Sequence, residues 1–137
     1  MEETVTIRDY TEFKMDEVLA LYRDAGWKNY LERAYILPEA YKNSLCALGA
    51  FDGDRLVGFI RAVGDGVSIV FIQDIIISAS WQRRGIGTRL MKTLLERYKG
   101  VYQIQLLTDD TEKTRAFYRA LGFRAAGETG CVAFIKM

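Results

Sequence analysis

Apolar and polar residues change their spacing several times along the 137-residue chain, and each spacing predicts an element. Met15, Val18, Leu19 and Tyr22 recur at the interval of one helix face. Runs of alternating or continuously apolar residues bounded by Gly and Asp predict strands. In chain order we expect a strand over 4–8, a helix over 15–26, a short helix over 38–41, strands over 45–51, 56–63 and 67–78, a helix over 86–98, a strand over 102–108, a helix over 112–121, and a closing hairpin over 123–126 and 131–136.

This order predicts a single α/β domain over residues 1–137, with a mixed, mostly antiparallel sheet flanked by helices. The strand, helix and strand between Val67 and Thr108 form a crossover, which is right-handed by strong precedent and makes its two strands parallel. No repeat or linker divides the chain.

The segment between the long strand and the helix that follows it is Gln82-Arg83-Arg84-Gly85-Ile86-Gly87-Thr88. A helix start leaves backbone N–H groups unpaired, and its partial positive charge favours an anion. Because Gly85 and Gly87 lack a Cβ, the backbone there can approach a phosphate closely. The segment therefore predicts an anion site suited to a pyrophosphate.

Charge supports a local anion site. The whole chain carries a net charge of +1, but residues 81–100 hold six basic side chains and one acidic one, a net of +5, which leaves −4 for the rest. A solvated basic helix face is the alternative interpretation. The near-neutral total argues against broad nucleic-acid binding, and no apolar run is long enough to predict a membrane span.

The chain has two cysteines, which form no close-spaced motif, so we do not expect a disulfide framework. Because the chain also has no histidine, we do not expect a zinc site. The beginning of the chain lacks the basic flank and apolar stretch of a signal peptide, so we expect a cytoplasmic protein with reduced thiols.

Two known phosphate-binding motifs do not fit the turn. A dinucleotide fingerprint needs a third glycine where Leu90 stands, and a P-loop needs a lysine before Thr88. The Gln-x-x-Gly-x-Gly pattern, together with Phe-Tyr-x-x-Leu-Gly-Phe over residues 117–123, resembles the GNAT superfamily of acyl-CoA N-acyltransferases. The resemblance covers residues 45–123 well and implies acetyl-CoA as the acyl donor and no metal.

The resemblance also implies site residues. Backbone amides from Arg83 to Thr88 would hold the diphosphate of coenzyme A. The residues that match this pyrophosphate loop and its flanks are Gln82, Arg83, Arg84, Gly85, Ile86, Gly87 and Thr88. Ile75 and Ile77 match strand positions whose backbone would pair with the thioester and pantetheine arm, where the strand splays from its parallel neighbour. Tyr118 matches a tyrosine near the sulfur. Asp109 and Asp110 stand where many members have an asparagine, and neither receives a cofactor role.

Acetylating an amine requires removal of a proton at a cost of roughly 4–5 kcal/mol near pH 7. A base, a water chain or selective binding of the neutral amine could meet this need. Asp74, inside an apolar strand, is the candidate base, and pairing with Arg61 on the neighbouring strand is its structural alternative. The Ile75 N–H is the oxyanion donor candidate. Tyr118 either protonates the leaving thiolate or only positions the sulfur.

Aromatic and acidic residues between Tyr22 and Tyr41 suggest an amine pocket, although most of these rings are expected simply to cover the sheet. Trp27 is the preferred pocket residue. We therefore expect an N-acetyltransferase that acts on a small primary amine by direct attack in a ternary complex. A non-catalytic acyl-CoA sensor is the alternative. No nucleic-acid or membrane partner is expected, and a strand of the last hairpin would offer a homodimer contact.

Overall fold

The computed structural model describes residues 4–137 and divides the chain after Leu106 into two compact units, which are described separately. The elements of the first unit are β1 (Val5–Asp9), α1 (Met15–Asp24), η1 (Ala34–Ile36), α2 (Leu37–Lys42), β2 (Cys46–Asp52), β3 (Arg55–Gly64), β4 (Ile69–Ile77), η2 (Ala79–Trp81), α3 (Ile86–Arg97) and β5 (Gln103–Leu106). The second unit contains α4 (Glu112–Ala120) and η3 (Ala126–Thr129).

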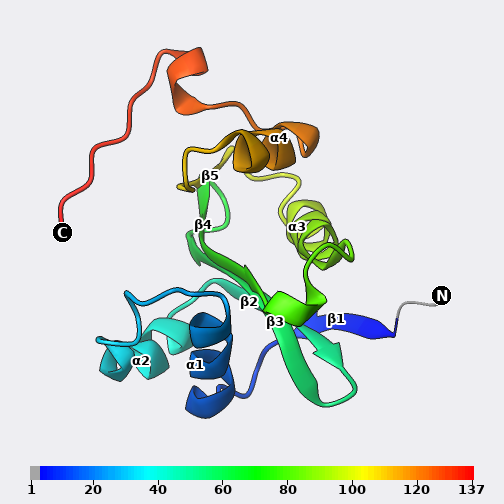
Figure 1. Cartoon of the computed structure of the whole chain (residues 1–137). Coiled ribbons are helices and arrows are strands. Elements are labelled where there is room, and N and C mark those ends of the chain that lie inside the picture. Colours follow the sequence, from blue (N-terminus) through cyan, green and yellow to red (C-terminus); the bar gives the residue numbers. More distant parts are fainter. Residues whose placement is uncertain (1–3) are drawn as a thin grey trace. The chain divides into compact units, whose positions relative to one another are not determined.

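The five strands form one sheet in the order β1-β2-β3-β4-β5. Neighbouring strands are antiparallel except β4 and β5, which are parallel as the crossover rule predicts. Helices α1 and α2 lie on one side of this sheet and α3 lies on the other (Figure 1). The predicted mixed, mostly antiparallel sheet flanked by helices is confirmed.

Each face of the sheet is covered because the helices carry an apolar stripe. On α3 the buried side chains are Ile86, Leu90, Met91 and Leu94. On the opposite face, Tyr22 of α1 and Leu37 of α2 pack in one cluster with Phe59 of β3 and Ile76 of β4. Tyr22 and Phe59 meet edge to face, with ring centroids 5.7 Å apart. Packing against α1 and α2 therefore holds β3 and β4 in place, and these two strands support the site described below.

Strand β4 contains an irregularity at Gln73. Asp74 pairs with Arg61 and Ile72 pairs with Ala62, so Gln73 is an extra residue with no partner on β3. Such a β-bulge bends a strand and changes the direction of nearby side chains. Here it allows consecutive residues, Gln73 and Asp74, both to contact tyrosines on the side of the sheet covered by α1.

The parallel pairing between β4 and β5 stops at the same point. It covers Ile69 to Ile72 on β4 and Gln103 to Leu106 on β5. Among residues 4–137, no strand pairs with β4 on that side from Gln73 onward. The last five residues of β4 thus have strand neighbours on one side only, and no strand of the described residues occupies the backbone groups on the other side, which could pair with a ligand.

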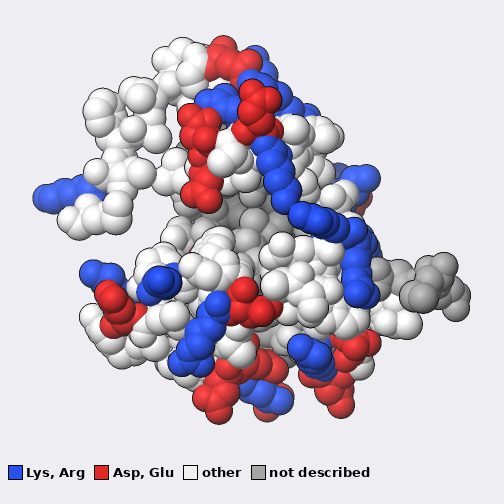
Figure 2. All heavy atoms as spheres, viewed as in Figure 1, with Lys and Arg blue, Asp and Glu red and all other residues white. Residues whose placement is uncertain are grey.

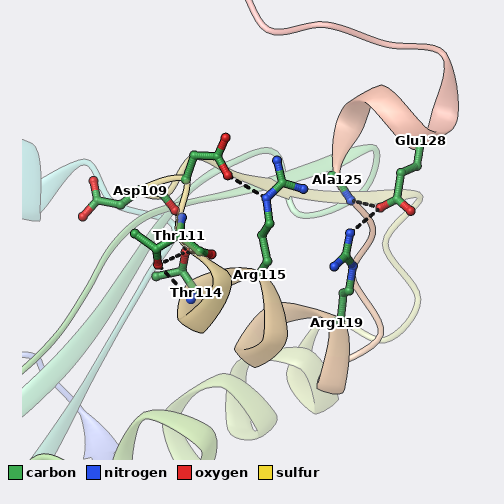
Figure 3. Close-up of polar contacts among 8 residues, drawn as sticks. Asp109, Thr111, Thr114, Arg115, Arg119, Ala125 and Glu128 are labelled. Atoms are coloured by element: carbon green, nitrogen blue, oxygen red, sulfur yellow. Dashed lines mark hydrogen bonds and ion pairs between the residues drawn. The ribbon is translucent and has the colours of Figure 1, made fainter.

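The second unit is organised by local polar contacts (Figure 3). The Thr111 hydroxyl caps α4 by accepting from the Thr114 N–H at 3.2 Å. Arg115 pairs with Asp110 at 2.6 Å. Arg119 pairs with Glu128 at 3.4 Å, and Glu128 also accepts from the Ala125 N–H at 3.1 Å. These contacts fix the residues that precede and follow α4.

The predicted closing hairpin is wrong. Residues 126–129 form a 3₁₀ helix, and residues 131–137 contain no strand. The Ala125 N–H bonds to Glu128, and Gly130 adopts φ +83°, so local bonds and a left-handed residue replace the extended backbone that a strand needs. Phe134 is consequently 92% exposed. The expectation of one domain over residues 1–137 stays a prediction. No helix within residues 4–137 is long and apolar enough to cross a membrane.

Candidate acyl-donor and acceptor site

The turn between β4 and α3 has the backbone conformation of an anion-binding loop. Gly85 is the N-cap of α3 with φ +79°, and Arg83 has φ +64°. Arg83 is the only residue other than glycine with a positive φ in the described part of the chain. Neighbouring residues that alternate between right-handed and left-handed conformations turn successive backbone N–H groups toward one point, the geometry known as a nest.

The first amides of α3 are available to a ligand. The first bond inside the helix joins the Arg89 N–H to the Gly85 carbonyl at 3.0 Å, and no side chain of the described residues caps this helix. The amides of Ile86, Gly87 and Thr88 therefore precede the internal helix bonds. Because the Ile86 side chain is buried, this residue can offer only its backbone. Gly85 is open, with no atom within 4 Å of where a Cβ would stand.

The charged side chains around this turn are exposed. The Arg84 guanidinium lies over the Trp81 ring, 4.6 Å from its centroid. This contact holds one positive charge near the turn. In Figure 2, Lys and Arg side chains gather around α3, whereas acidic and basic side chains interleave over the lower part of the face, where α1 lies.

The side chain of Gln82 makes a structural contact that the sequence did not predict. Its Nε2 donates to the Ile77 carbonyl at 3.0 Å, which ties the turn to the end of β4. The Ile77 carbonyl therefore already accepts one hydrogen bond, whereas its N–H is a donor available for the predicted pairing with a ligand. Ile75 and Ile77 both lie in the part of β4 beyond its pairing with β5. The structure thus brings the predicted strand residues and the predicted loop into one continuous segment.

Asp74 lies in a buried polar cluster. Its side chain forms an ion pair with Arg61, with 2.9 Å between Nη2 and Oδ2, and the Tyr22 hydroxyl donates to the same oxygen at 3.1 Å. Burial is the largest effect on this group and raises the pKa of Asp74, against the opposing charge and hydrogen bonds of Arg61. The structural alternative, pairing with Arg61, is present in the structure. The role of Asp74 as a base stays a prediction.

Two residues from the loop between α1 and α2 lie beside this cluster. Trp27 is half-buried, and its ring centroid lies 6.0 Å from that of Tyr22. Tyr30 packs against Tyr22 at 4.9 Å, and its hydroxyl accepts from Gln73 Nε2 at 3.1 Å. The sequence pointed to Trp27 as the pocket residue but did not separate Tyr30 from the other aromatic residues of this region.

Tyr118 belongs to the second unit. Its ring meets Phe117 and Phe123 edge to face, with centroids 5.0 and 5.8 Å away. Burial raises the pKa of its hydroxyl, so this group is protonated near neutral pH and can donate a hydrogen bond. Its role as the acid, or as a residue that positions sulfur, stays a prediction.

A hollow on the first unit is lined by none of the predicted site residues. It has a volume of about 410 Å³ and is lined by residues that include Glu17, Asp24, Arg55 and Ser78. Asp24 there accepts hydrogen bonds from the Ser78 hydroxyl and the Ala79 N–H, which lower its pKa. Within residues 4–137, no group of three His, Cys, Asp or Glu residues could hold a metal ion.

Comparison with known proteins places these features in a family. Residues 10–123 match the family described as the acetyltransferase (GNAT) family. A GNAT-family acetyltransferase of known structure from Streptococcus pneumoniae TIGR4 is 44% identical, with 97% of each chain covered and a TM-score of 0.87. The chain is also similar to "GCN5-related N-acetyltransferase 1, chloroplastic" of Arabidopsis thaliana, with 39% identity over 50% of this chain and 35% of the plant protein.

A third similarity is to "Serotonin N-acetyltransferase 2, chloroplastic" of Oryza sativa subsp. japonica, with 39% identity over 50% of this chain and 34% of the rice protein. The matched segment thus spans only about a third of each plant relative. The bulged strand, the left-handed turn and the open helix start agree with the match over residues 10–123, and the chain belongs to the acetyltransferase (GNAT) family.

Proposed function

We propose that the protein is an acetyl-CoA-dependent N-acetyltransferase that acetylates a primary amine of a small molecule. The observation that carries this proposal is the continuity of two features. The free edge of β4 from Gln73 to Ile77 leads through the left-handed turn at Arg83 and Gly85 into the unpaired first turn of α3. Family membership and the names of the relatives support acetyl transfer to nitrogen.

The turn has the right donors for the diphosphate of coenzyme A. Amides from Arg83 to Thr88 would bind it, because an N-terminal helix turn combines aimed N–H groups with a favourable dipole. The free edge of β4 would then hold the pantetheine arm by backbone hydrogen bonds, with the Ile75 N–H as the donor for the oxyanion. Acetyl-CoA supplies an activated acyl group to this arrangement.

Direct attack by the amine is favoured over an acyl-enzyme. Cys46 is buried in β2, and burial raises the pKa of its thiol, so it is a poor nucleophile near neutral pH. The amine must lose its proton, for which Asp74 is the proposed base. The leaving thiolate must gain a proton, for which Tyr118 is the proposed donor. One relative is named for serotonin, which carries a primary amine, and this supports a small-molecule acceptor.

An amine panel tests the proposal. Purified protein would be incubated with acetyl-CoA and primary amines of varied size, and CoA release would be followed together with the product mass. A product heavier by one acetyl group supports the proposal. Tight binding of acetyl-CoA with no acetylated product on any amine would contradict it and indicate the sensor role instead.

A further inference from the structure

Gln73 is the extra residue of the β4 bulge and also the first residue of the free edge of β4. On β3, Ala62 pairs with Ile72 and Arg61 pairs with Asp74, so Gln73 has no partner there. The pairing of β4 with β5 ends at Ile72. Because neither neighbouring strand pairs with Gln73, and because its side chain is exposed, this residue is available for a contact of another kind.

That contact is with the loop that follows α1, residues 25–33. Gln73 Nε2 donates to the Tyr30 hydroxyl oxygen at 3.1 Å, which joins two residues 43 positions apart. The backbone hydrogen bonds of this loop, in contrast, remain within the loop or join it to α1 and η1, and among the described residues none of them reaches the sheet. The amide of Gln73 therefore connects the loop to the edge of β4.

The side chain of Tyr30 is held at both ends. Its ring packs against the ring of Tyr22, with centroids 4.9 Å apart and an interplanar angle of 37°. Tyr22 is fully buried, and its hydroxyl donates to Asp74 on β4 at 3.1 Å, so this support is rigid. Gln73 holds the hydroxyl end. Loss of the Gln73 amide would release the outer end of Tyr30 and leave the ring contact in place.

The two halves of the loop are supported differently. The Trp27 N–H bonds to the Tyr22 carbonyl at 2.8 Å, and the Trp27 ring lies 6.0 Å from the Tyr22 ring, so Trp27 is supported by α1. The Arg33 N–H instead bonds to the Tyr30 carbonyl at 3.2 Å, within the loop itself. The half of the loop around Tyr30 is thus the part that depends on Gln73.

The Gln73–Tyr30 hydrogen bond is close to the place proposed for the thioester. Ile75, the proposed oxyanion donor, is two residues further along β4, which is roughly 7 Å at the rise of a β-strand. Both Gln73 and Ile75 belong to the free edge of β4. An amine that attacks a thioester held at Ile75 would therefore lie within a side-chain length of this hydrogen bond.

We propose that Gln73 is a positioning residue for the acceptor. By holding the Tyr30 hydroxyl, it fixes residues 25–33 as one wall of the acceptor site and limits the size of the amine that fits. Gln73 makes no contact with the reacting atoms. A wall that is already ordered costs the amine less on binding, so the benefit lies in amine affinity and not in the chemical step. This inference rests on the proposed function and adds to it a determinant of acceptor size.

Gln73→Met tests this role, because methionine keeps the length of the side chain and removes its amide. The KM for a short primary alkylamine should rise roughly 3- to 10-fold, the contribution of about one hydrogen bond, while kcat and the KM for acetyl-CoA change little. For a bulky primary amine the rise should be smaller, because a loosened wall admits it more easily. Gln103→Met, the same change at an exposed glutamine at the other end of the β4–β5 pairing, is the matched control and should alter none of these values.

A double-mutant cycle determines whether Gln73 acts through Tyr30. Tyr30→Phe removes the hydroxyl and keeps the ring, so it should raise the KM for the short amine to a similar extent. Adding Gln73→Met to Tyr30→Phe should change the KM little further, since either substitution alone already removes the hydrogen bond. Fully additive effects would overturn the positioning role, as would an unchanged KM for both amines in Gln73→Met.

Hydrogen exchange measures the support of the loop without any substrate. In Gln73→Met the Arg33 amide should exchange faster and the Trp27 amide should keep its rate, whereas Gln103→Met should change neither. Unchanged exchange at Arg33 would overturn this inference and leave the proposed function standing. If the unaltered protein acetylates no amine, the proposed function fails and the positioning role fails with it, even where exchange at Arg33 becomes faster.

Discussion

Two residues hold the turn before α3 in conformations that most side chains avoid. Gly85 has φ +79° and Arg83 has φ +64°. The left-handed conformation costs a residue with a Cβ roughly 1–2 kcal/mol, whereas glycine adopts it freely. An arginine kept in this conformation indicates that the turn is determined by its surroundings rather than by local preference.

Gly85→Val should therefore weaken acetyl-CoA binding by at least about tenfold, since about 1.4 kcal/mol of strain or displacement equals one order of magnitude in affinity. A branched side chain would be strained at φ +79° and would stand where the donor must approach. Isothermal titration calorimetry with acetyl-CoA measures the effect. Gly100→Ala, at a glycine that also has open space but no positive φ, is the control and should bind normally.

Tyr118→Phe should reduce kcat by roughly 10²-fold or more and leave the affinity for acetyl-CoA little changed. Burial keeps the hydroxyl protonated, so its loss removes a proton donor without removing the ring contacts to Phe117 and Phe123. Steady-state kinetics and calorimetry on the same preparation separate the two quantities. Full activity in the variant would exclude the role as acid.

At the scale of elements, the turn between β3 and β4 depends on one carboxylate. Asp65 accepts from the N–H groups of Val67, Ser68 and Ile69 at 2.8 to 3.1 Å. It also accepts from the Ser68 hydroxyl at 2.6 Å. These bonds stabilise the charged form and hold the pKa of Asp65 far below its usual value. The turn is the start of the strand that carries Asp74 and Ile75.

Asp65→Ala should lower the melting temperature by a few degrees at neutral pH. Because the folded-state pKa is depressed, the stabilisation is complete above the unfolded value of about 3.9 and is lost as pH falls toward the folded value. The difference in melting temperature between the two proteins should therefore be constant above about pH 5 and shrink below about pH 4. Asp54→Ala, in the exposed turn between β2 and β3, is the control and should leave the melting temperature at neutral pH little changed.

The elements up to Ala120 followed from local pattern, because each carries its own signal. Gly26 with φ +79° ends α1, and the apolar stripe of α3 continues through Leu94 as expected. The final hairpin failed because a strand also needs a partner, which local pattern does not provide. Cys131 to Met137 is apolar enough for a strand, yet the bonds around Glu128 and the left-handed Gly130 form a turn of helix before it.

In the candidate site, too, contiguous segments could be predicted from the sequence, whereas contacts between distant segments could not. The loop from Gln82 to Thr88 is contiguous in sequence, so it could be identified from the sequence as a candidate anion site, and its role in binding the cofactor stays a prediction. The bulge at Gln73 could not, because it exists only in the register between β3 and β4. For the same reason, the sequence could not distinguish Tyr30 from the neighbouring aromatic residues. Its hydrogen bond with Gln73 depends on the register of the two strands. Contacts between residues more than forty positions apart require the fold.

At the scale of the whole molecule, charge is divided between a basic region and an acidic remainder. Residues 81–100 carry +5 and the rest carries −4. The basic region includes the turn proposed to bind a polyanionic donor. Long-range attraction of this kind accelerates association and is screened by salt.

Raising the ionic strength from about 0.01 M to about 1 M should slow acetyl-CoA association several-fold, because the Debye length shortens from ~30 Å to ~3 Å. Stopped-flow fluorescence measures the rate. An acetylated pantetheine without the diphosphate is the control ligand and should associate at nearly the same rate at both ionic strengths. Equal salt dependence for the two ligands would place the electrostatic contact elsewhere.

The Arg61–Asp74 pair has a practical consequence for protein engineering. Replacing both members of a buried ion pair by well-packed apolar side chains is often neutral or raises stability by about 1–4 kcal/mol. A search for heat-resistant variants that selects only for survival at high temperature would therefore tend to remove this pair. Such variants would fold well and lack the proposed base, so a thermostability campaign on this scaffold should screen for the product of the proposed reaction at every round.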